Sequence, residues 1–320
     1  MNLTREQLQL ASLATGFAAA VIEKDAYLLA ILEGFNRHPY LRGKLALKGG
    51  TALNLFLFNV PRLSVDIDLN YIGAVDRDTM IAERPKVEQA IGSVCQREGL
   101  SVQKIPSEHA GGSWNLRYKS VFGPTDALKI DVVYMYRIPL WPPQWMDSHP
   151  ISTFQATGIL VLDQYELAAG KLAALIARRT SRDLFDAHAL LTKLRLDRER
   201  LRLGFVLYGA MNILDWRKVS AEDIEPAAAD LESYLLPLLG TQNVLTESAL
   251  LAERLLKECI EALAIVLPLV PNELEFLEQL LEYGEIKPEL ITSDEQMQDT
   301  ITHHPSLLWK ALNVRKYKGL

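Results

Sequence analysis

The stretch Lys48-Gly49-Gly50-Thr51, followed by Ser64-Val65-Asp66-Ile67-Asp68-Leu69, decides how this chain is interpreted. Its second part alternates strictly between polar and apolar residues, which predicts a half-buried strand with Asp66 and Asp68 on the same face. Two neighbouring carboxylates repel each other unless a positive charge lies between them. Solvated acids on an exposed strand are the simpler interpretation. Their position just after the glycine turn instead favours a site for a hard divalent cation such as Mg²⁺.

The first part of the stretch predicts a strand that turns into a helix. Leu45-Ala46-Leu47 is typical of a short buried strand, Gly49 and Gly50 interrupt it, and the apolar spacing over 51–58 predicts a helix. Thr51 is expected to be the N-cap of this helix, which Pro61 is expected to end. Glycines beside a helix N-terminus form a cradle for phosphate, although ordinary turn chemistry explains most such pairs.

A third acid lies on another predicted strand. Leu128-Lys129-Ile130-Asp131-Val132-Val133 alternates in the same way and carries Asp131 among its polar positions. If this strand is a neighbour of the Asp66 strand, three carboxylates converge on one face, as two-metal nucleotidyl transfer requires. Otherwise Asp131 is a surface acid.

The rest of the chain separates into a mixed front half and a helical back half. The front half is expected to hold helices over 4–37 and 77–98 and further strands at 100–105, 113–121, 127–136 and 159–162. Residues 138–150 are interpreted as a loop or linker. Helices are expected at 164–178, 182–194, 198–213, 221–236, 246–266 and 272–283. The pattern predicts an α+β fold with domains at 1–160 and 161–320, and it places His303-His304 at the surface.

Composition limits the class of protein. The chain has 320 residues, of which 49% are hydrophobic and 23% charged, as in ordinary globular proteins. No apolar run is long enough to span a bilayer, and the N-terminus does not resemble a signal peptide. Two isolated cysteines, Cys95 and Cys259, fit a reduced, cytoplasmic protein. The net charge of -6 argues against a wholly basic nucleic-acid binder. Local basic patches remain, at Arg178-Arg179 with Arg182 and in the tail.

The motifs resemble a known family. Lys48-Gly49-Gly50-Thr51-Ala52-Leu53 with Arg62-x-Ser64-x-Asp66-Ile67-Asp68-Leu69 is similar to the AbiEii/AbiGii toxins, nucleotidyltransferases of the DNA polymerase β-like superfamily from type IV toxin–antitoxin or abortive-infection systems. Further along, 166–175 and Arg182-Asp183-x-x-Asp186 resemble the later motifs of that family. The resemblance covers roughly residues 24–195.

This resemblance implies a fold and a set of roles. It implies a polymerase β-like core with a mixed sheet over 1–160 and an all-α domain over 161–320 that completes the active-site cleft. The catalytic residues that it implies are Asp66, Asp68, Lys171, Asp183 and Asp186; those that bind the nucleotide are Lys48, Gly49, Gly50, Thr51, Ser64 and Arg182; and the metal ligands are Asp66, Asp68 and Asp131.

The residues of the second motif are consistent with these roles but do not establish them. Lys171 lies on an apolar helical stripe, from which it either extends to solvent or reaches phosphate. Asp183 and Asp186 share one helical face, and an acid in a first turn is often only a partner of the helix dipole.

The function that follows is a toxin that transfers a nucleotide from an NTP to RNA. The resemblance implies the tRNA 3′ acceptor end as the target, so that aminoacylation and translation are blocked, with Mg²⁺ or Mn²⁺ as cofactor and a cognate antitoxin encoded nearby. Two alternatives stay open at this stage. One is nucleotidylation of a protein side chain, because a fold does not fix the acceptor. The other is a non-catalytic nucleotide-binding partner, against which the intact glycines and aspartates argue.

Overall fold

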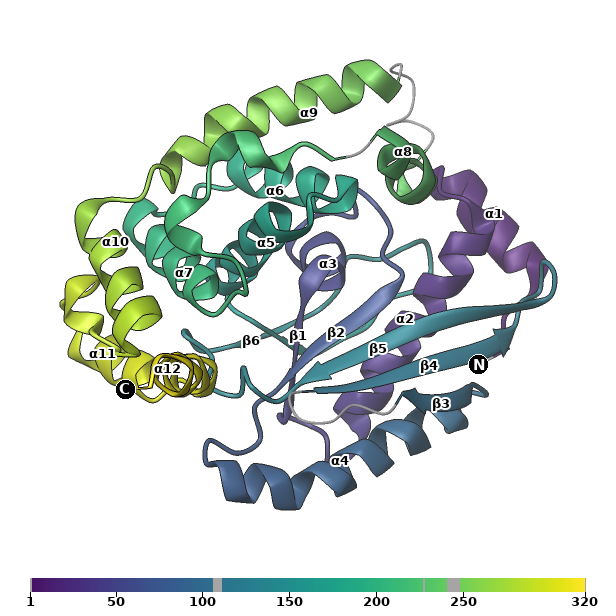
Figure 1. Cartoon of the computed structure of the whole chain (residues 1–320). Helices are drawn as coiled ribbons and strands as arrows, with labels where there is room; N and C mark the ends of the chain where they lie inside the picture. The colour runs from purple at the N-terminus through teal and green to yellow at the C-terminus, as the bar shows by residue number, and fades with distance from the viewer. Residues whose placement is uncertain (1, 106–110, 227, 241–247, 320) are drawn as a thin grey trace. The chain divides into compact units, whose positions relative to one another are not determined.

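The computed structural model describes residues 2–105, 111–226, 228–240 and 248–319. The chain divides into two compact units, one made of residues 1–163 and 236–246 and the other of residues 164–235 and 247–320. The first unit therefore ends three residues beyond position 160 and is joined again by a later segment, through which the carbonyl of Leu238 accepts the N–H of Leu63 at 2.9 Å. Figure 1 follows the chain by colour from the purple N-terminus to the yellow C-terminus.

A seven-stranded mixed sheet forms the centre of the first unit, in the order β3-β4-β5-β2-β1-β7-β6. Its strands are β1 Leu45–Lys48, β2 Asp66–Tyr71, β3 Ser101–Ile105, β4 Gly111–Lys119, β5 Thr125–Val133, β6 Gln144–Met146 and β7 Ile159–Val161. β2 pairs parallel to β5 and antiparallel to β1, so the strand that carries both aspartates lies inside the sheet. The mixed α+β fold predicted from the sequence is confirmed.

Alternation along β2 and β5 gives the sheet one apolar face and one polar face. Ile67 is in register with Ile130, and both are fully buried. On this same face the hydroxyl of Tyr71 donates to Glu83 of helix α4 (Arg77–Arg97), and Tyr118 packs against Tyr27 of helix α2 (Ala19–Arg37) with 4.3 Å between ring centroids. α2 and α4 therefore cover the apolar face, and the carboxylates of β2 lie on the other.

The helices of this unit are α1 Arg5–Thr15, α2 Ala19–Arg37, α4 Arg77–Arg97 and the short α3 Gly49–Thr51. Gly16, in the left-handed conformation with φ 76°, separates α1 from α2 within the predicted helical stretch. α3 continues directly into a π-helical segment, η1 Ala52–Leu57. The structure thus corrects the expected N-cap: the helix already begins at Gly49 after Lys48, Thr51 is helical, and the helix ends at Leu57, before Pro61.

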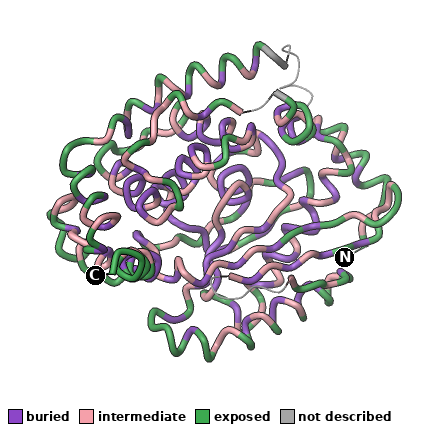
Figure 2. Tube along the Cα trace, viewed as in Figure 1, coloured by how far each residue is buried: buried purple, intermediate pink, exposed green. Residues whose placement is uncertain are grey.

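The second unit is built from helices. Its α-helices are α5 Gln164–Arg178, α6 Ser181–Lys193, α7 Arg198–Ala210, α8 Ala228–Asp230, α9 Ser248–Ala262, α10 Pro271–Glu278, α11 Glu295–Thr302 and α12 Pro305–Lys318. Shorter turns are η2 Trp216–Lys218, η3 Ala221–Ile224, η4 Leu231–Leu235, η7 Leu263–Ile265, η8 Gln279–Tyr283 and η9 Pro288–Leu290, while η5 Leu236–Leu238 belongs to the first unit. In Figure 2 the buried residues follow α5 and the strands, whereas α4, α9 and α12 show many exposed residues.

Several predicted elements differ from the structure for identifiable reasons. The helix expected over 221–236 is broken into short turns, because Pro226 favours extended backbone at Glu225, where ψ is 119°. The expected loop at 138–150 contains β6, an edge strand that follows two prolines. His304, expected at the surface, is 1% exposed at the start of α12, and His303 is exposed and pairs with Asp299.

Within the described ranges, no helix is long and apolar enough to cross a membrane. Cys95 and Cys259 are free and buried, and burial raises the pKa of each thiol to about 12.

A pair of glycines tests the packing of α2 on α4. A Cβ at Gly34 would lie 2.5 Å from Cγ1 of the buried Val94, whereas a Cβ at Gly92 of α4 would meet nothing within 4 Å. We expect Gly34→Ala to lower the free energy of unfolding by about 1–3 kcal/mol through overpacking. Gly92→Ala should raise it by up to about 1 kcal/mol, because alanine is the better helix former. Urea unfolding measures both, and equal effects would contradict this packing.

Candidate active site

The turn between β1 and α3 is built around Gly49. This residue has φ +73°, a conformation that other L-residues rarely adopt. A Cβ at Gly49 would overlap Oδ2 of Asp68 and would lie 3.1 Å from its Cβ and Cγ. Glycine is therefore required both by the backbone conformation and by the aspartate that packs against it. The Gly-Gly turn and the carboxylate strand, separate motifs in the sequence, are in direct contact.

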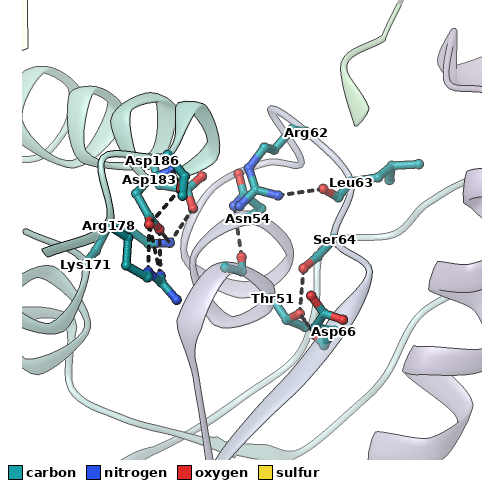
Figure 3. Close-up of polar contacts among 12 residues, drawn as sticks. Thr51, Asn54, Arg62, Leu63, Ser64, Asp66, Lys171, Arg178, Asp183 and Asp186 are labelled. Atoms are coloured by element: carbon teal, nitrogen blue, oxygen red, sulfur yellow. Dashed lines mark hydrogen bonds and ion pairs between the residues drawn. The ribbon is translucent and has the colours of Figure 1, made fainter. Parts of the chain in front are cut away.

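Hydrogen bonds fix the helix start against the beginning of β2 (Figure 3). The hydroxyl of Thr51 donates to the carbonyl oxygen of Asp66 at 2.5 Å and lies 2.8 Å from the hydroxyl of Ser64. Thr51 and Ser64 are 1% and 5% exposed. Both were predicted to bind the nucleotide. The structure engages their hydroxyls with each other and with β2, so a direct contact of either hydroxyl with a triphosphate stays a prediction.

The register of the sheet gathers the predicted metal ligands on one face. Asp68 is the Cα partner of Asp131 on β5 and of Lys48 on β1, and Asp66 is the partner of Lys129. Paired residues of neighbouring strands project to the same face. Asp66, Asp68 and Asp131 therefore share one face, on which Lys48 also lies, with its ammonium 5.3 Å from the ring centroid of Tyr136.

Asp131 already has two partners. The ammonium of Lys129 is 2.7 Å from its Oδ2, and the hydroxyl of Ser113, its register partner on β4, donates to Oδ1. The hydrogen bond to Asp131 raises the pKa of Lys129, and the negative charges of Asp66 and Asp68 add to this effect. Lys129 thus offsets part of the negative charge that the three aspartates place on this face.

The donor set fits a magnesium-type cation that is completed by its substrate. Among the residues that the structure describes, no three His, Cys, Asp or Glu side chains are gathered closely enough to form a metal site on their own. Mg²⁺ is commonly held by only one or two carboxylates, with phosphate oxygens and water as the other ligands. Asp66 and Asp68 supply such a pair beside a turn whose backbone can approach phosphate.

The second unit holds its own cluster of the predicted site residues. The ammonium of Lys171 on α5 lies 2.9 Å from Oδ1 of Asp183 and 2.8 Å from Oδ2 of Asp186, both on α6 (Figure 3). The exposed side chain of Arg178 pairs with Asp183 at 2.9 Å, and the hydroxyl of Thr180, the N-cap of α6, donates to it at 2.8 Å. Lys171 neither reaches solvent nor is an isolated cation, because two buried carboxylates neutralise it.

This cluster has a defined pH response. Burial alone would raise the pKa of Asp183, but the charges of Lys171 and Arg178, with hydrogen bonds from Lys171 and Thr180, lower it below its ordinary value. A carboxyl whose folded pKa is lowered adds stability that is complete above its unfolded pKa of about 3.9, and this stability is lost as the pH falls through the folded value. The cluster is therefore a stabilising element of this unit at neutral pH.

Of the remaining predicted residues, Arg182 is half-buried on α6, one position before Asp183. Gly50 lies in α3, where its carbonyl accepts a hydrogen bond from Asn54 at 2.9 Å. The structure thus brings Lys48, Gly49, Gly50, Thr51, Ser64, Asp66, Asp68 and Asp131 together in one unit, and Lys171, Arg182, Asp183 and Asp186 lie on two packed helices of the other.

Two residues that contact the candidate site, Asp25 and Lys129, were not predicted from the sequence. Asp25 is fully buried on α2, where its carboxylate accepts the N–H of Ser64 at 3.3 Å. Burial raises the pKa of Asp25 well above its ordinary value, although this hydrogen bond and the charge of Arg62 oppose the effect. A signal existed, because Asp25 falls on the apolar stripe that Ile22, Ala26 and Leu29 form at helical spacing.

Comparison with known proteins decides the family. The model of the family described as "Nucleotidyl transferase AbiEii toxin, Type IV TA system" matches residues 30–253, more than half of the chain. The chain belongs to the AbiEii nucleotidyltransferase toxin family. No curated protein matches the sequence significantly.

Among solved structures, this AbiEii family member is similar to MenT4, a nucleotidyltransferase toxin from Mycobacterium tuberculosis H37Rv. The TM-score is 0.60 and the identity is 19%, over 96% of this chain and 99% of the other. At this identity the likeness establishes a shared fold. The family match, in turn, makes the chain a nucleotidyltransferase toxin of a type IV toxin–antitoxin system, as the motifs predicted.

Because Lys171 is buried between two carboxylates, its replacement is expected to lower the stability of the fold. Lys171→Met would leave two carboxylates, 2% and 1% exposed, without their shared ammonium. We expect the free energy of unfolding at pH 7 to fall by about 3–5 kcal/mol. Lys218→Met is the control, since Lys218 is 81% exposed and 3.7 Å from Asp215, and it should change stability by less than about 0.5 kcal/mol. Similar values for both variants in urea unfolding would rule out the ion cluster as described.

Proposed function

We propose that this chain transfers a nucleoside monophosphate from an NTP to the 3′ end of RNA, with tRNA as the acceptor, and that it uses Mg²⁺ or Mn²⁺. The observation that carries the proposal is the placement of Asp66, Asp68 and Asp131 on one sheet face, directly against the Gly49 turn. A nucleotidyltransferase must hold a triphosphate and compensate its charge at the same point, and this arrangement offers the means for both.

The turn supplies the triphosphate site in this proposal. Backbone N–H groups at 49–51 begin a helix, where no partner within the helix is available to them, so they would bind phosphate oxygens, and Lys48 adds a positive charge on the carboxylate face. The hydroxyls of Thr51 and Ser64 support this site by holding the helix start on β2. Their tight internal bonding favours an indirect role over direct contact with the nucleotide.

Asp66 and Asp68 would hold the cation, with Asp131 as the predicted third ligand. If Asp131 joins them, its ion pair with Lys129 must be exchanged for the cation, which frees an ammonium for the triphosphate. When bound, the cation supplies Lewis-acid chemistry, which lowers the pKa of the acceptor hydroxyl and neutralises the departing pyrophosphate. A side chain at position 49 would displace the carboxylate of Asp68, so glycine allows this carboxylate to lie against the turn.

The reaction forms one bond and breaks one. The acceptor hydroxyl oxygen bonds to the α-phosphorus of the NTP, the bond from that phosphorus to the α–β bridging oxygen breaks, and pyrophosphate leaves. The hydroxyl proton passes to solvent or to a carboxylate on this face. The task of the protein is to position the two reactants and to stabilise charge, which is the main source of catalysis in such transfers.

We assign Lys171, Asp183 and Asp186 to the same activity on the strength of the family motif. Asp183 and Asp186 already bind the ammonium of Lys171, so this ammonium would contact phosphate in addition to the two carboxylates. Loss of activity in a Lys171 variant is therefore informative only when the stability of the variant is also measured.

Exposed arginines favour RNA over a protein as the acceptor. The side chains of Arg178 and Arg179 are 61% and 55% exposed, although Arg178 also pairs with Asp183 and Arg179 lies 3.6 Å from Asp223, and Arg182 follows them on α6. Cations at the protein surface bind the phosphate backbone of nucleic acids even when the whole chain is acidic. Because the family belongs to type IV toxin–antitoxin systems, we also expect a cognate antitoxin encoded nearby.

The test is transfer of label from each α-phosphate-labelled NTP to total tRNA with Mg²⁺ present. We expect label in RNA with the wild type, and a loss of at least about 100-fold with Asp68→Asn. Asp126→Asn is the matched control, because Asp126 lies on β5 as Asp131 does but on the opposite face, where it pairs with Lys24. It should retain transfer.

Each other result counts against a stated part of the proposal. Transfer by Asp68→Asn at the wild-type rate would refute the role of this aspartate. Label in protein rather than in RNA would refute the acceptor, and transfer that persists in excess EDTA would refute the cation.

A further inference from the structure

A buried acid outside every motif of the chain is linked to the proposed cation site. Asp25 on α2 is fully buried, and its Oδ1 accepts the backbone N–H of Ser64 at 3.3 Å. Its Oδ2 is also buried and has no hydrogen-bond partner within the described residues. A buried carboxylate with one oxygen unsatisfied is costly for a fold, so its presence calls for an explanation.

The hydrogen bonds that start at Ser64 have a fixed direction. A threonine hydroxyl has one hydrogen, and the hydroxyl of Thr51 gives it to the carbonyl of Asp66. The hydroxyl of Ser64 must therefore donate to Oγ1 of Thr51, 2.8 Å away. Two links follow from Ser64: its backbone N–H is held by Asp25, and its hydroxyl holds Thr51, which in turn holds Asp66.

This series of hydrogen bonds, from Asp25 through Ser64 and Thr51 to Asp66, joins three parts of the first unit. Asp25 belongs to α2 beneath the sheet, Thr51 to the helix start after the glycine turn, and Asp66 is the first residue of β2. Ser64 lies in the segment that leads into β2, where no strand pairing fixes the backbone. Here the N–H of Leu63 is held by the carbonyl of Leu238, and the side chain of Asp25 holds the N–H of Ser64.

We propose that Asp25 is a positioning residue for the cation site: through Ser64 and Thr51 it fixes the start of β2, and so sets the spacing of the Asp66 and Asp68 carboxylates. The inference rests on the proposed function, in which these two aspartates hold the cation. Asp25 itself touches neither the nucleotide nor the metal.

The competing explanation is that Asp25 only stabilises the fold, and the chain contains a matched control for it. Glu23 lies on the same helix, is also fully buried, and holds the turn after β4 by accepting from the hydroxyl of Ser120 and the N–H of Val121. It has the same kind of role in packing, but it contacts neither Ser64 nor Thr51 in the structure. A purely structural role predicts equal consequences for the two acids.

The experiment measures Mn²⁺ binding to the full-length protein by the loss of the free-ion electron paramagnetic resonance signal. Asp68→Asn first defines the part of the binding that belongs to this site. We expect Asp25→Ala to weaken that part by about 10-fold to 100-fold, the effect typical of residues that orient metal ligands. Glu23→Ala should leave it within about twofold of the wild type, even where both variants lose similar stability in urea.

A second pair of variants acts at the other end of the series, in case Asp25→Ala does not fold. Thr51→Val keeps the shape but removes the hydroxyl, and it should weaken Mn²⁺ binding as Asp25→Ala does, whereas Thr51→Ser restores most of it. The double variant Asp25→Ala with Thr51→Val should bind no more weakly than the weaker single variant, because both cut the same link.

Two negative results are distinguishable. A wild type without Mn²⁺ binding that depends on Asp68 would refute the cation site and, with it, this inference. Binding that depends on Asp68 but is unchanged by Asp25→Ala, or by Thr51→Val, would leave the cation site standing and overturn the positioning role alone.

Discussion

Repulsion among three carboxylates on one sheet face is the constraint on which the candidate site depends. The parallel pairing of β2 with β5 sets Asp68 beside Asp131, and the alternation of β2 adds Asp66. Like charges on one face are costly unless a positive charge or a hydrogen-bond donor offsets them. The ammonium of Lys129 and the hydroxyl of Ser113 do so for Asp131, and the placement of Asp66 and Asp68 next to a glycine turn suits a divalent cation with its triphosphate.

The two polar clusters of this protein differ in how far their charges are compensated within the protein. Lys171 is paired with Asp183 and Asp186, and Asp183 also binds Arg178 and Thr180, so the cluster is neutralised without any ligand. On the carboxylate face of the sheet, in contrast, the hydrogen bond to Asp131 and the negative charges of Asp131, Asp66 and Asp68 raise the pKa of Lys129. Buried ion pairs of the first kind are costly to break because a buried charge is left without its partner, and perturbed titratable groups like those of the second kind are common at functional sites.

The sequence predicted the elements that a local pattern determines. The alternation in β2 and β5 and the helical spacing of α5 and α6 were visible because each depends on the period of its own residues. Contacts between distant segments were not visible. Nothing local indicates that Gly49 packs on Asp68, that Lys171 is buried between two acids, or that Asp25 holds Ser64. The hydroxyls of Thr51 and Ser64, predicted as ligands of the nucleotide, proved to be bonded within the protein, which only the tertiary structure could show.

The most direct test of the central claim is crystallographic. Crystals grown with Mn²⁺ and a non-hydrolysable NTP should give an anomalous difference peak about 2.1 Å from a carboxylate oxygen of Asp66 and of Asp68, with the triphosphate against the turn at Gly49. Such a peak would establish the carboxylate face as the cation site of this AbiEii family member. A bound triphosphate with its Mn²⁺ held by other residues, or with no peak near these two aspartates, would contradict the account.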